Sequence, residues 1–412
     1  MGNLFKIAVR NLWRYKRRTL LTASLITMGV VFVLVFISVS GSFKNMIVGQ
    51  ITDSMLGHVQ IHRQGYVASI DNLPLNLNIR NQGFRQLETL LKQQPEVAAY
   101  SPRIKFGGMF STFVETTNIR LNGIYPEQEF KTVPLLPARV SQGRKTLERG
   151  EIYLPDLLHK GMGVKVGDTV VIVATNQDGS VNGKQFKVAG VLESATGPGG
   201  RDGYVHIEDA MEILRLEELE VSEVAIRLKD FDQLHLFTAK MERLVKAAGG
   251  TKGPVRYEVH SWEKLSPFFA IAQMINLLTF FIKLMLIAIV LISIMNVMIM
   301  AVYERIREIG TMAAIGTLPG KILSMFVLEG FCLGVLGTVV GNLVGGIILY
   351  IVNLSRISYE FGRQSGLILS VQFNPRDIIV ISLIVILVSV LASLQPAFKA
   401  SRMEPIKALR HV

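Results

Sequence analysis

The sequence predicts a membrane protein with four transmembrane α-helices and a large α+β extracytoplasmic domain inserted between helices 1 and 2. Two observations lead to this fold class. Half of the 412 residues are apolar and only 18% are charged, whereas soluble domains typically hold about 25% charged residues. Four apolar runs are long enough to cross a hydrocarbon core of about 30 Å as helices, and a long, more polar stretch separates the first run from the second.

The predicted spans cover residues 20–41, 268–302, 322–354 and 378–396. At about 1.5 Å per residue the second and third outrun the bilayer, so they must tilt or project beyond it. Lys283 would be poorly placed at mid-membrane, which favours a projecting stalk for the second span. Ser38-Val39-Ser40 also resembles a signal-peptide cleavage site, but the first apolar run exceeds the usual length of about 7–15 residues, which favours a retained helix.

Basic residues next to the spans predict the orientation. Residues 1–19, 303–321 and 399–412 together hold 13 basic and 3 acidic residues, while the rest of the chain holds 31 and 29. Because basic residues collect on the cytoplasmic side, we expect a cytoplasmic N-terminus (1–19), loop (303–321) and tail (397–412). The segments 42–267 and 355–377 then lie outside. The positive charge is thus a topology signal, and no nucleic-acid partner is expected.

The outer segment 42–267 alternates between strand and helix patterns. Strands are predicted at 59–61, 119–122, 164–173 and 186–192, and helices at 84–91, 209–219 and 231–247. Its histidines are scattered; His58 and His62 are four apart, but in a strand-like context without a third ligand. No G-x-S-x-G motif occurs, and the lone cysteine, Cys332, lies in an apolar span. We therefore predict no catalytic or metal site, and a binding or force-transmitting role.

The loop 303–321 has the pattern of a short amphipathic helix that ends near Gly316 and Pro319. Its polar residues are Glu304, Arg305, Arg307 and Glu308. Such a helix can dock on a soluble partner, or it can be a plain interfacial connector.

Three segments carry a family resemblance. They are the motif E-R-x-x-E-I-G-x-x-x-A-x-G at Glu304–Gly316, the N-terminal stretch Asn11–Thr22, and the C-terminal stretch Pro396–Arg410. Together with Gly123-Ile-Tyr-Pro and Gly163-Val-Lys-Val-Gly-Asp in the outer segment, they resemble the MacB/FtsX-like permease superfamily. By this resemblance 42–267 is a MacB-like periplasmic core domain and 303–412 an FtsX-like permease region.

The resemblance implies a type VII ABC exporter architecture in a bacterial inner membrane. Two permease chains, identical or different, would pair with a cytoplasmic ABC ATPase dimer. The coupling helix would then comprise Glu304, Arg305, Arg307, Glu308, Gly310 and Gly316. The segment Gly316–Ile322 departs from a P-loop in its glycine spacing and in having Ile322 at the Ser/Thr position. ATP and Mg²⁺ are therefore expected on the partner ATPase, and no cofactor on this chain.

Two sets of residues inside the spans are candidates for helix packing or for contact with a cargo or a second permease. The third span carries glycines at four-residue spacing, which favours close packing against a helix of the same chain over permease–permease contact; they are Gly330, Gly334, Gly337, Gly341 and Gly345. Phe32, Phe36, Met274 and Met295 are predicted either to pack in the core or to face a cargo or a second permease. Glu329, an ionisable residue at the start of the third span, is predicted either to have a functional role or to pair with Lys321 at the membrane interface.

The resemblance favours a permease that extracts or exports lipoprotein, lipid or another amphiphilic cargo by mechanotransmission. Membrane lipid and a periplasmic adaptor or lipoprotein carrier are its expected partners. A LolC-type subunit carries a long hairpin that recruits a periplasmic chaperone, whereas the connection 174–184 here is short, which puts chaperone recruitment in doubt. The alternative is an FtsX-like regulator of a periplasmic cell-wall hydrolase that transports nothing.

Overall fold

The structure, a computed structural model, describes residues 2–193, 202–248, 256–355, 358–361, 364–368, 371 and 374–404. The chain divides into two compact units. The helical unit comprises Met1–Lys44, Gln273–Ile357 and Ile368–Val412, and the sheet domain comprises Asn45–Ala272 and Ser358–Leu367. The inserted domain therefore starts and ends a few residues later than the predicted range 42–267.

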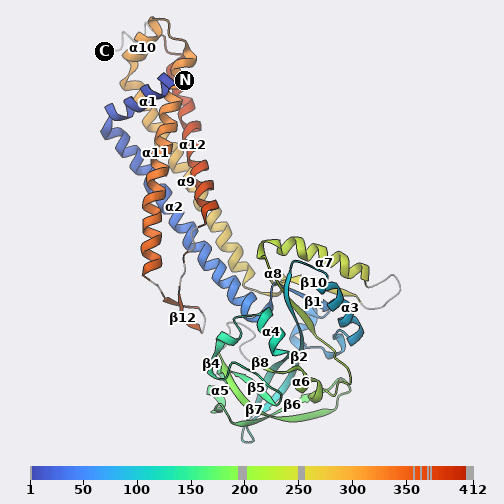
Figure 1. Cartoon of the computed structure of the whole chain (residues 1–412). Helices are drawn as coiled ribbons and strands as arrows, with labels where there is room; N and C mark the ends of the chain where they lie inside the picture. Colours follow the sequence, from blue (N-terminus) through green and yellow to red (C-terminus); the bar gives the residue numbers. More distant parts are fainter. Residues whose placement is uncertain are drawn as a thin grey trace. The chain divides into compact units, whose positions relative to one another are not determined.

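Four long apolar helices run through the helical unit (Figure 1). They are α2 (Lys16–Ile51), α9 (Phe269–Glu304), α11 (Pro319–Leu354) and α12 (Pro375–Ser401). The first span was predicted to end at 41, but α2 continues to Ile51 and a π-helical turn extends it to Leu56. Both helices that lead into and out of the sheet domain are thus longer than a bilayer requires, whereas the sequence predicted a stalk only for the second.

Two further differences lie at the chain ends. Residues 2–14 form an amphipathic helix, α1 (Gly2–Arg14), with Ala8 and Leu12 buried, where only a basic segment was predicted. The fourth span was predicted to end at 396, but α12 continues through Pro396 to Ser401. Pro396 and Ala397 are buried in the helical unit, so tertiary packing compensates for the backbone hydrogen bond that a proline removes. Between α11 and α12, where a plain loop was predicted, the described residues include β11 (Ser358–Phe361) and β12 (Gln364–Ile368).

Six strands of the sheet domain pair in a closed circuit. They are β2 (Val97–Ser111), β3 (Thr116–Ile124), β5 (Glu151–Pro155), β6 (Thr169–Thr175), β7 (Val181–Leu192) and β8 (Asp202–His206). Strand β2 pairs with β3, β3 with β8, β8 with β5, β5 with β7, β7 with β6, and β6 again with β2. A sheet that closes on itself leaves no free edge, and its inward-facing residues form one core.

The six strands thus form a barrel, and its core consists of side chains from alternate residues along each strand. Ile104, Phe106 and Phe110 of β2 lie in one buried cluster with Val170 and Ile172 of β6 and with residues of the other four strands. Helix α5 (Asp156–Met162) and helix α6 (Ile207–Ile213) add apolar side chains to the same cluster. The sequence predicted a helix over 209–219, but it ends at Ile213 because Arg215 adopts a positive φ of 50°. Predicted strand 164–173 starts only at Thr169, after Gly167 with φ 97°.

Three more strands extend the sheet from β2. They are β9 (Glu223–Leu228), β1 (Val59–Arg63) and β10 (Tyr257–Ser261), while β4 (Val140–Gly143) pairs with β7. Helices α3 (Asn81–Lys92) and α7 (Leu234–Ala248) bury one apolar face each, and Figure 1 shows α7 beside β10. Strand β9, which was not predicted from the sequence, connects this extension to the barrel.

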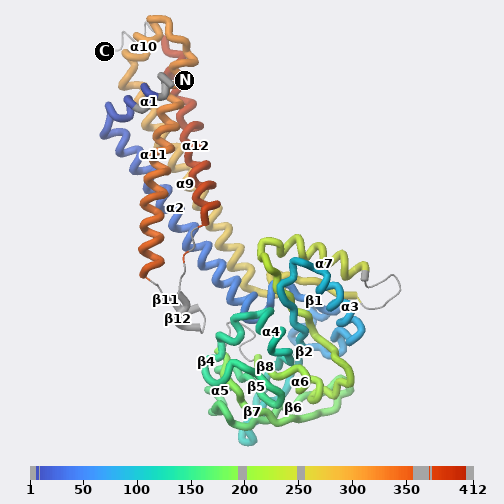
Figure 2. Tube along the Cα trace, viewed as in Figure 1, coloured from blue at the N-terminus to red at the C-terminus, as the bar shows by residue number. Residues whose placement is uncertain are grey.

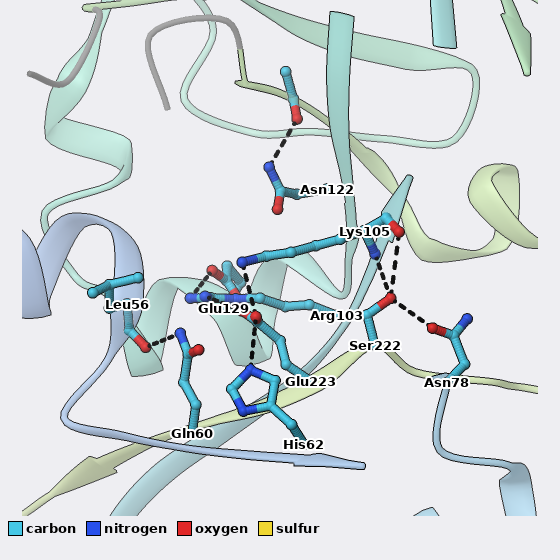
Figure 3. Close-up of polar contacts among 11 residues, drawn as sticks. Leu56, Gln60, His62, Asn78, Arg103, Lys105, Asn122, Glu129, Ser222 and Glu223 are labelled. Carbon is cyan, nitrogen blue, oxygen red and sulfur yellow. Dashed lines mark hydrogen bonds and ion pairs between the residues drawn. The ribbon is translucent and has the colours of Figure 1, made fainter. Parts of the chain in front are cut away.

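A buried charged network joins β1, β2, β9 and α4 (Pro126–Thr132), as Figure 3 shows. Arg103 on β2 binds Glu223 on β9 at 2.8 Å and Glu129 on α4 at 2.7 Å. Lys105 Nζ lies 2.8 Å from Glu223, and His62 Nε2 lies 3.5 Å from it. Both carboxylates are fully buried. Each charge thus has a counter-charge, the condition under which buried ions are tolerated.

Glu223 is expected to make the sheet domain sensitive to acid. Burial by itself raises the pKa of the Glu223 carboxyl, but Lys105, His62 and Arg103 outweigh it and hold this pKa well below its ordinary value of 4.5. Such a group stabilises the fold above its unfolded pKa, and this contribution is lost as the pH falls through its folded pKa. We therefore expect the free energy of unfolding to decline below about pH 4.5, and Glu223→Gln to flatten that decline.

The measurement is urea unfolding at several acidic pH values in a Trp13→Phe background, followed by the fluorescence of Trp262, which is buried in the sheet domain. A Glu223→Gln chain whose stability declines as steeply with acid as the unaltered chain would contradict this assignment.

Candidate functional site

The segment predicted as one coupling helix, Glu304–Gly316, is divided between two helices. Helix α9 ends at Glu304, and α10 (Ile306–Ala314) starts after Arg305, whose φ of −110° and ψ of 18° are not helical. Helix α10 ends at Ala314. The turn that follows contains Gly316, whose φ of 93° favours glycine, and Thr317 N donates to the Met312 carbonyl at 3.0 Å. The prediction of a short amphipathic helix was therefore wrong at its start, because Glu304 belongs to the long helix α9.

A buried charged cluster surrounds the break between α9 and α10. Arg305 Nη1 lies 3.2 Å from Glu329 Oε2 on α11, and Arg18 Nη2 on α2 lies 3.0 Å from the other oxygen of the same carboxylate. Arg18 Nη1 also binds Glu304 at 3.1 Å. The guanidinium of Arg305 lies 4.6 Å from the ring centre of Tyr15, within the range of a cation–π contact.

This cluster corrects two expectations. Arg305 was predicted to face a soluble partner, but its side chain is only 2% exposed, and Glu329 is 0% exposed. Glu329 pairs with two arginines and not with Lys321, which is exposed. Arg18 and Tyr15 were not predicted to be part of this site. The available signal was an acidic residue inside an apolar span, since such a group must find a buried counter-charge.

The exposed part of this region lies on α10 and on the turn to α11. Figure 2 shows α10 and α1 at the same end of the helical unit, and Glu308 of α10 pairs with Arg14 of α1 at 3.4 Å on the surface. Arg307 is also exposed, while Gly310 is buried. In the turn itself, Ile315 is 80% exposed and Leu318 is 64% exposed. Two large apolar side chains therefore stand beside charged residues, an arrangement typical of a protein contact.

The glycines of α11 pack against two helices of the same unit. A Cβ at Gly330 or Gly334 would lie 2.5 Å from the side chains of Ser393 or Ser389 on α12. A Cβ at the other three would lie 2.5 to 2.7 Å from α2, where Gly337 faces Ile26, Gly341 faces Val30 and Gly345 faces Leu34. These distances are shorter than real Cβ contacts, so an added Cβ forces a neighbour to move at each site; at Gly345 that neighbour is only the flexible end of Leu34.

The four residues predicted for a cargo or dimer face differ in exposure. Phe32 on α2 is 56% exposed and stacks with the half-buried Phe36 at 6.5 Å between ring centres. Met274 on α9 is 55% exposed, whereas Met295 is half-buried. Across its most apolar window α9 has 17% of its residues buried, compared with 28–33% for the other three long helices. Helix α9 is thus the least covered of the four long helices across its apolar window.

Two family models match the chain. The model of the MacB-like periplasmic core domain matches residues 19–244, and that of the FtsX-like permease C-terminal region matches residues 280–405. The lipoprotein-releasing system transmembrane protein LolC of Xylella fastidiosa (strain 9a5c) is 24% identical over 408 residues, which cover 94% of this chain and 92% of the relative. LolE of Haemophilus influenzae is 22% identical over 345 residues, which cover 79% and 80%. The periplasmic region of MacB from Actinobacillus actinomycetemcomitans aligns with a TM-score of 0.38 at 16% identity, covering 52% of this chain and 94% of that one.

Proposed function

This chain belongs to the family of ABC-transporter permeases with a MacB-like periplasmic core domain and an FtsX-like permease region, and on that premise we propose that a separate ATPase drives it to move an amphiphilic cargo. The relatives named above are components of lipoprotein-releasing systems. A lipoprotein or lipid is therefore the proposed cargo. ATP and Mg²⁺ would be bound by the ATPase, in a complex that also contains a second permease.

The observation that carries this proposal is the exposed turn between α10 and α11. Ile315 and Leu318 are largely exposed, at the end of the helical unit that also carries the basic N-terminal segment. If that end is cytoplasmic, as the charge asymmetry predicts, these side chains meet water and not lipid. A groove on the ATPase that covers them would remove about 25 cal/mol of unfavourable free energy for each Å² of apolar surface buried.

Force would reach the sheet domain through α2 and α9. These two helices enter and leave the main segment of the domain, Asn45–Ala272, and each has 36 residues. An unbroken helix is stiff, because every added residue keeps its own backbone hydrogen bond. Movement of α10 would thus be carried along α9 to the outer side, which is the mechanotransmission that the family resemblance implies.

The short connection between β6 and β7 argues against recruitment of a periplasmic chaperone by this chain. Strand β6 ends at Thr175, β7 starts at Val181, and Gly179 between them has φ 83°. A tight hairpin of this kind offers no long arm for a chaperone. We propose that a lipoprotein carrier, if one is used, binds the second permease of the complex.

The contact with the ATPase can be tested by making the turn acidic. We expect Ile315→Asp with Leu318→Asp to reduce the amount of ATPase that co-purifies with the chain from native membranes by at least about tenfold, because two contact residues near the centre of an interface typically carry much of its binding free energy. Quantitative mass spectrometry of the purified complex measures this. Val114→Asp is the matched control, since Val114 is 90% exposed in the sheet domain.

The possible results separate the functions. An undiminished ATPase in the double variant would show that the turn is not the contact. Recovery of the unaltered chain with a cell-wall hydrolase and without any ATPase would instead support the regulatory alternative. Lipids and lipoproteins in the same preparation would identify the cargo.

A further inference from the structure

The helical unit has a break where force would have to pass. Helix α9 ends at Glu304 and α10 begins at Ile306, with a non-helical Arg305 between them. At such a break the two helices can change their angle with little resistance. A push on α10 would then be absorbed by bending, unless side chains hold the junction in place.

We propose that Glu329 is a positioning residue that fixes this junction, so that α10, α2 and α11 move together. The inference rests on the proposed function, because the ATPase is what would displace α10. Glu329 is suited to this role because its two carboxylate oxygens bind different helices. One oxygen accepts from Arg305 at the junction, and the other accepts from Arg18 on α2.

The cluster closes on both sides of the break. Arg18 also binds Glu304, the last residue of α9, at 3.1 Å, so that the charges alternate from Arg305 through Glu329 and Arg18 to Glu304. Two positive and two negative groups balance. The two ion pairs of Glu329 have little water around them and are therefore strong and directional, whereas the Glu304 side chain is 40% exposed. Tyr15 lies between α1 and α2, and the centre of its ring is 4.6 Å from the Arg305 guanidinium. The segment that joins α1 to α2 therefore also contacts the cluster.

Two simpler roles for Glu329 do not account for this arrangement. A glutamate that only reaches for the membrane surface would keep its carboxylate in water, but this side chain is 0% exposed. A glutamate that only neutralises a neighbour on its own helix would not need partners 311 and 24 residues away in the sequence. The carboxylate instead connects three helices that meet at the break.

The first test requires neither ATPase nor cargo. Arg14 and Glu308 are in side-chain contact at 3.4 Å on the surface, so nitroxide labels on Arg14→Cys and Glu308→Cys report the position of α10. Cys332, which is buried, is replaced by alanine. We expect strong dipolar broadening with Glu329 present, weaker and more dispersed broadening with Glu329→Gln, and an intermediate result with Glu329→Asp, which keeps the charge but is one methylene shorter.

Thr338→Val is the matched control, because Thr338 is a buried polar residue on the same helix at 2% exposure. We expect it to leave the spectrum unchanged. An unchanged spectrum in a folded, monodisperse Glu329→Gln chain would overturn the proposal. If Glu329→Gln does not fold, the double variant Glu329→Gln with Arg305→Gln takes its place, because it removes one charge of each sign and leaves no unpaired charge at the junction. The dipolar broadening between the two labels is then measured in the double variant.

The second test uses the complete complex. We expect Glu329→Gln to keep the ATPase bound and ATP hydrolysis unchanged, but to reduce ATP-dependent cargo release about tenfold or more, as in other cases where the coupling between two sites is lost. Loss of the bound ATPase itself would contradict a positioning role. If the unaltered chain carries no ATPase, the proposed function fails, while the label measurement still decides the role of Glu329.

Discussion

Glu223→Ala is expected to destabilise the sheet domain by about 3–5 kcal/mol, the usual cost of removing one partner from a buried ion pair. The glutamate is fully buried and lies within 2.8 Å of both Arg103 and Lys105. Without it, Lys105 loses its carboxylate and Arg103 keeps only Glu129. The desolvation cost of these cations then remains without its compensation, and the contacts between β1, β2 and β9 are weakened.

The measurement is chemical unfolding of the full chain in detergent, read by the fluorescence of Trp262 in the Trp13→Phe background. Glu148→Ala provides the control, because Glu148 forms an exposed pair with Arg144 at 4.0 Å, and such pairs contribute about 0–1 kcal/mol. A loss of stability no larger for Glu223→Ala than for Glu148→Ala would show that the network does not hold the domain together.

The second large effect is expected at Gly341 on α11. A Cβ there would lie 2.7 Å from both Cβ and Cγ1 of Val30. Because the Val30 Cβ is bonded directly to the backbone of α2, a change of rotamer cannot move it away. Gly341→Ala should therefore separate α2 from α11 and cost about 1–3 kcal/mol, the range for an overpacked core.

A graded series makes this prediction specific. Gly345→Ala should cost less, since its nearest neighbour is Cδ2 at the flexible end of Leu34. At Gly320, in the first turn of the same helix, no atom lies within 4 Å of the added Cβ among the described residues, so Gly320→Ala should not destabilise. Val30→Ala should partly restore Gly341→Ala. Thermal unfolding in one detergent measures the series, and equal effects at Gly341 and Gly320 would contradict it.

The four spans and the inserted domain could be predicted from the sequence because a bilayer imposes its requirements locally. Twenty or so consecutive apolar residues are needed to cross it, whatever their neighbours are. The glycine spacing on α11 likewise predicted close packing from one helix alone, but not which helix lies opposite. The structure shows that Gly330 and Gly334 face α12, while Gly337, Gly341 and Gly345 face α2.

Tertiary structure alone decided what the charged residues do. In the sequence Arg305 stands among exposed polar residues, and nothing local distinguishes it from Arg307. Its partner Glu329 lies on the next helix, and Arg18, which completes the cluster, lies 311 residues before Glu329 in the chain. The barrel depends in the same way on the pairing of β6 with β2. Local patterns report how single segments meet lipid or water, whereas the burial of a charge or the closing of a sheet depends on which distant segments the fold brings together.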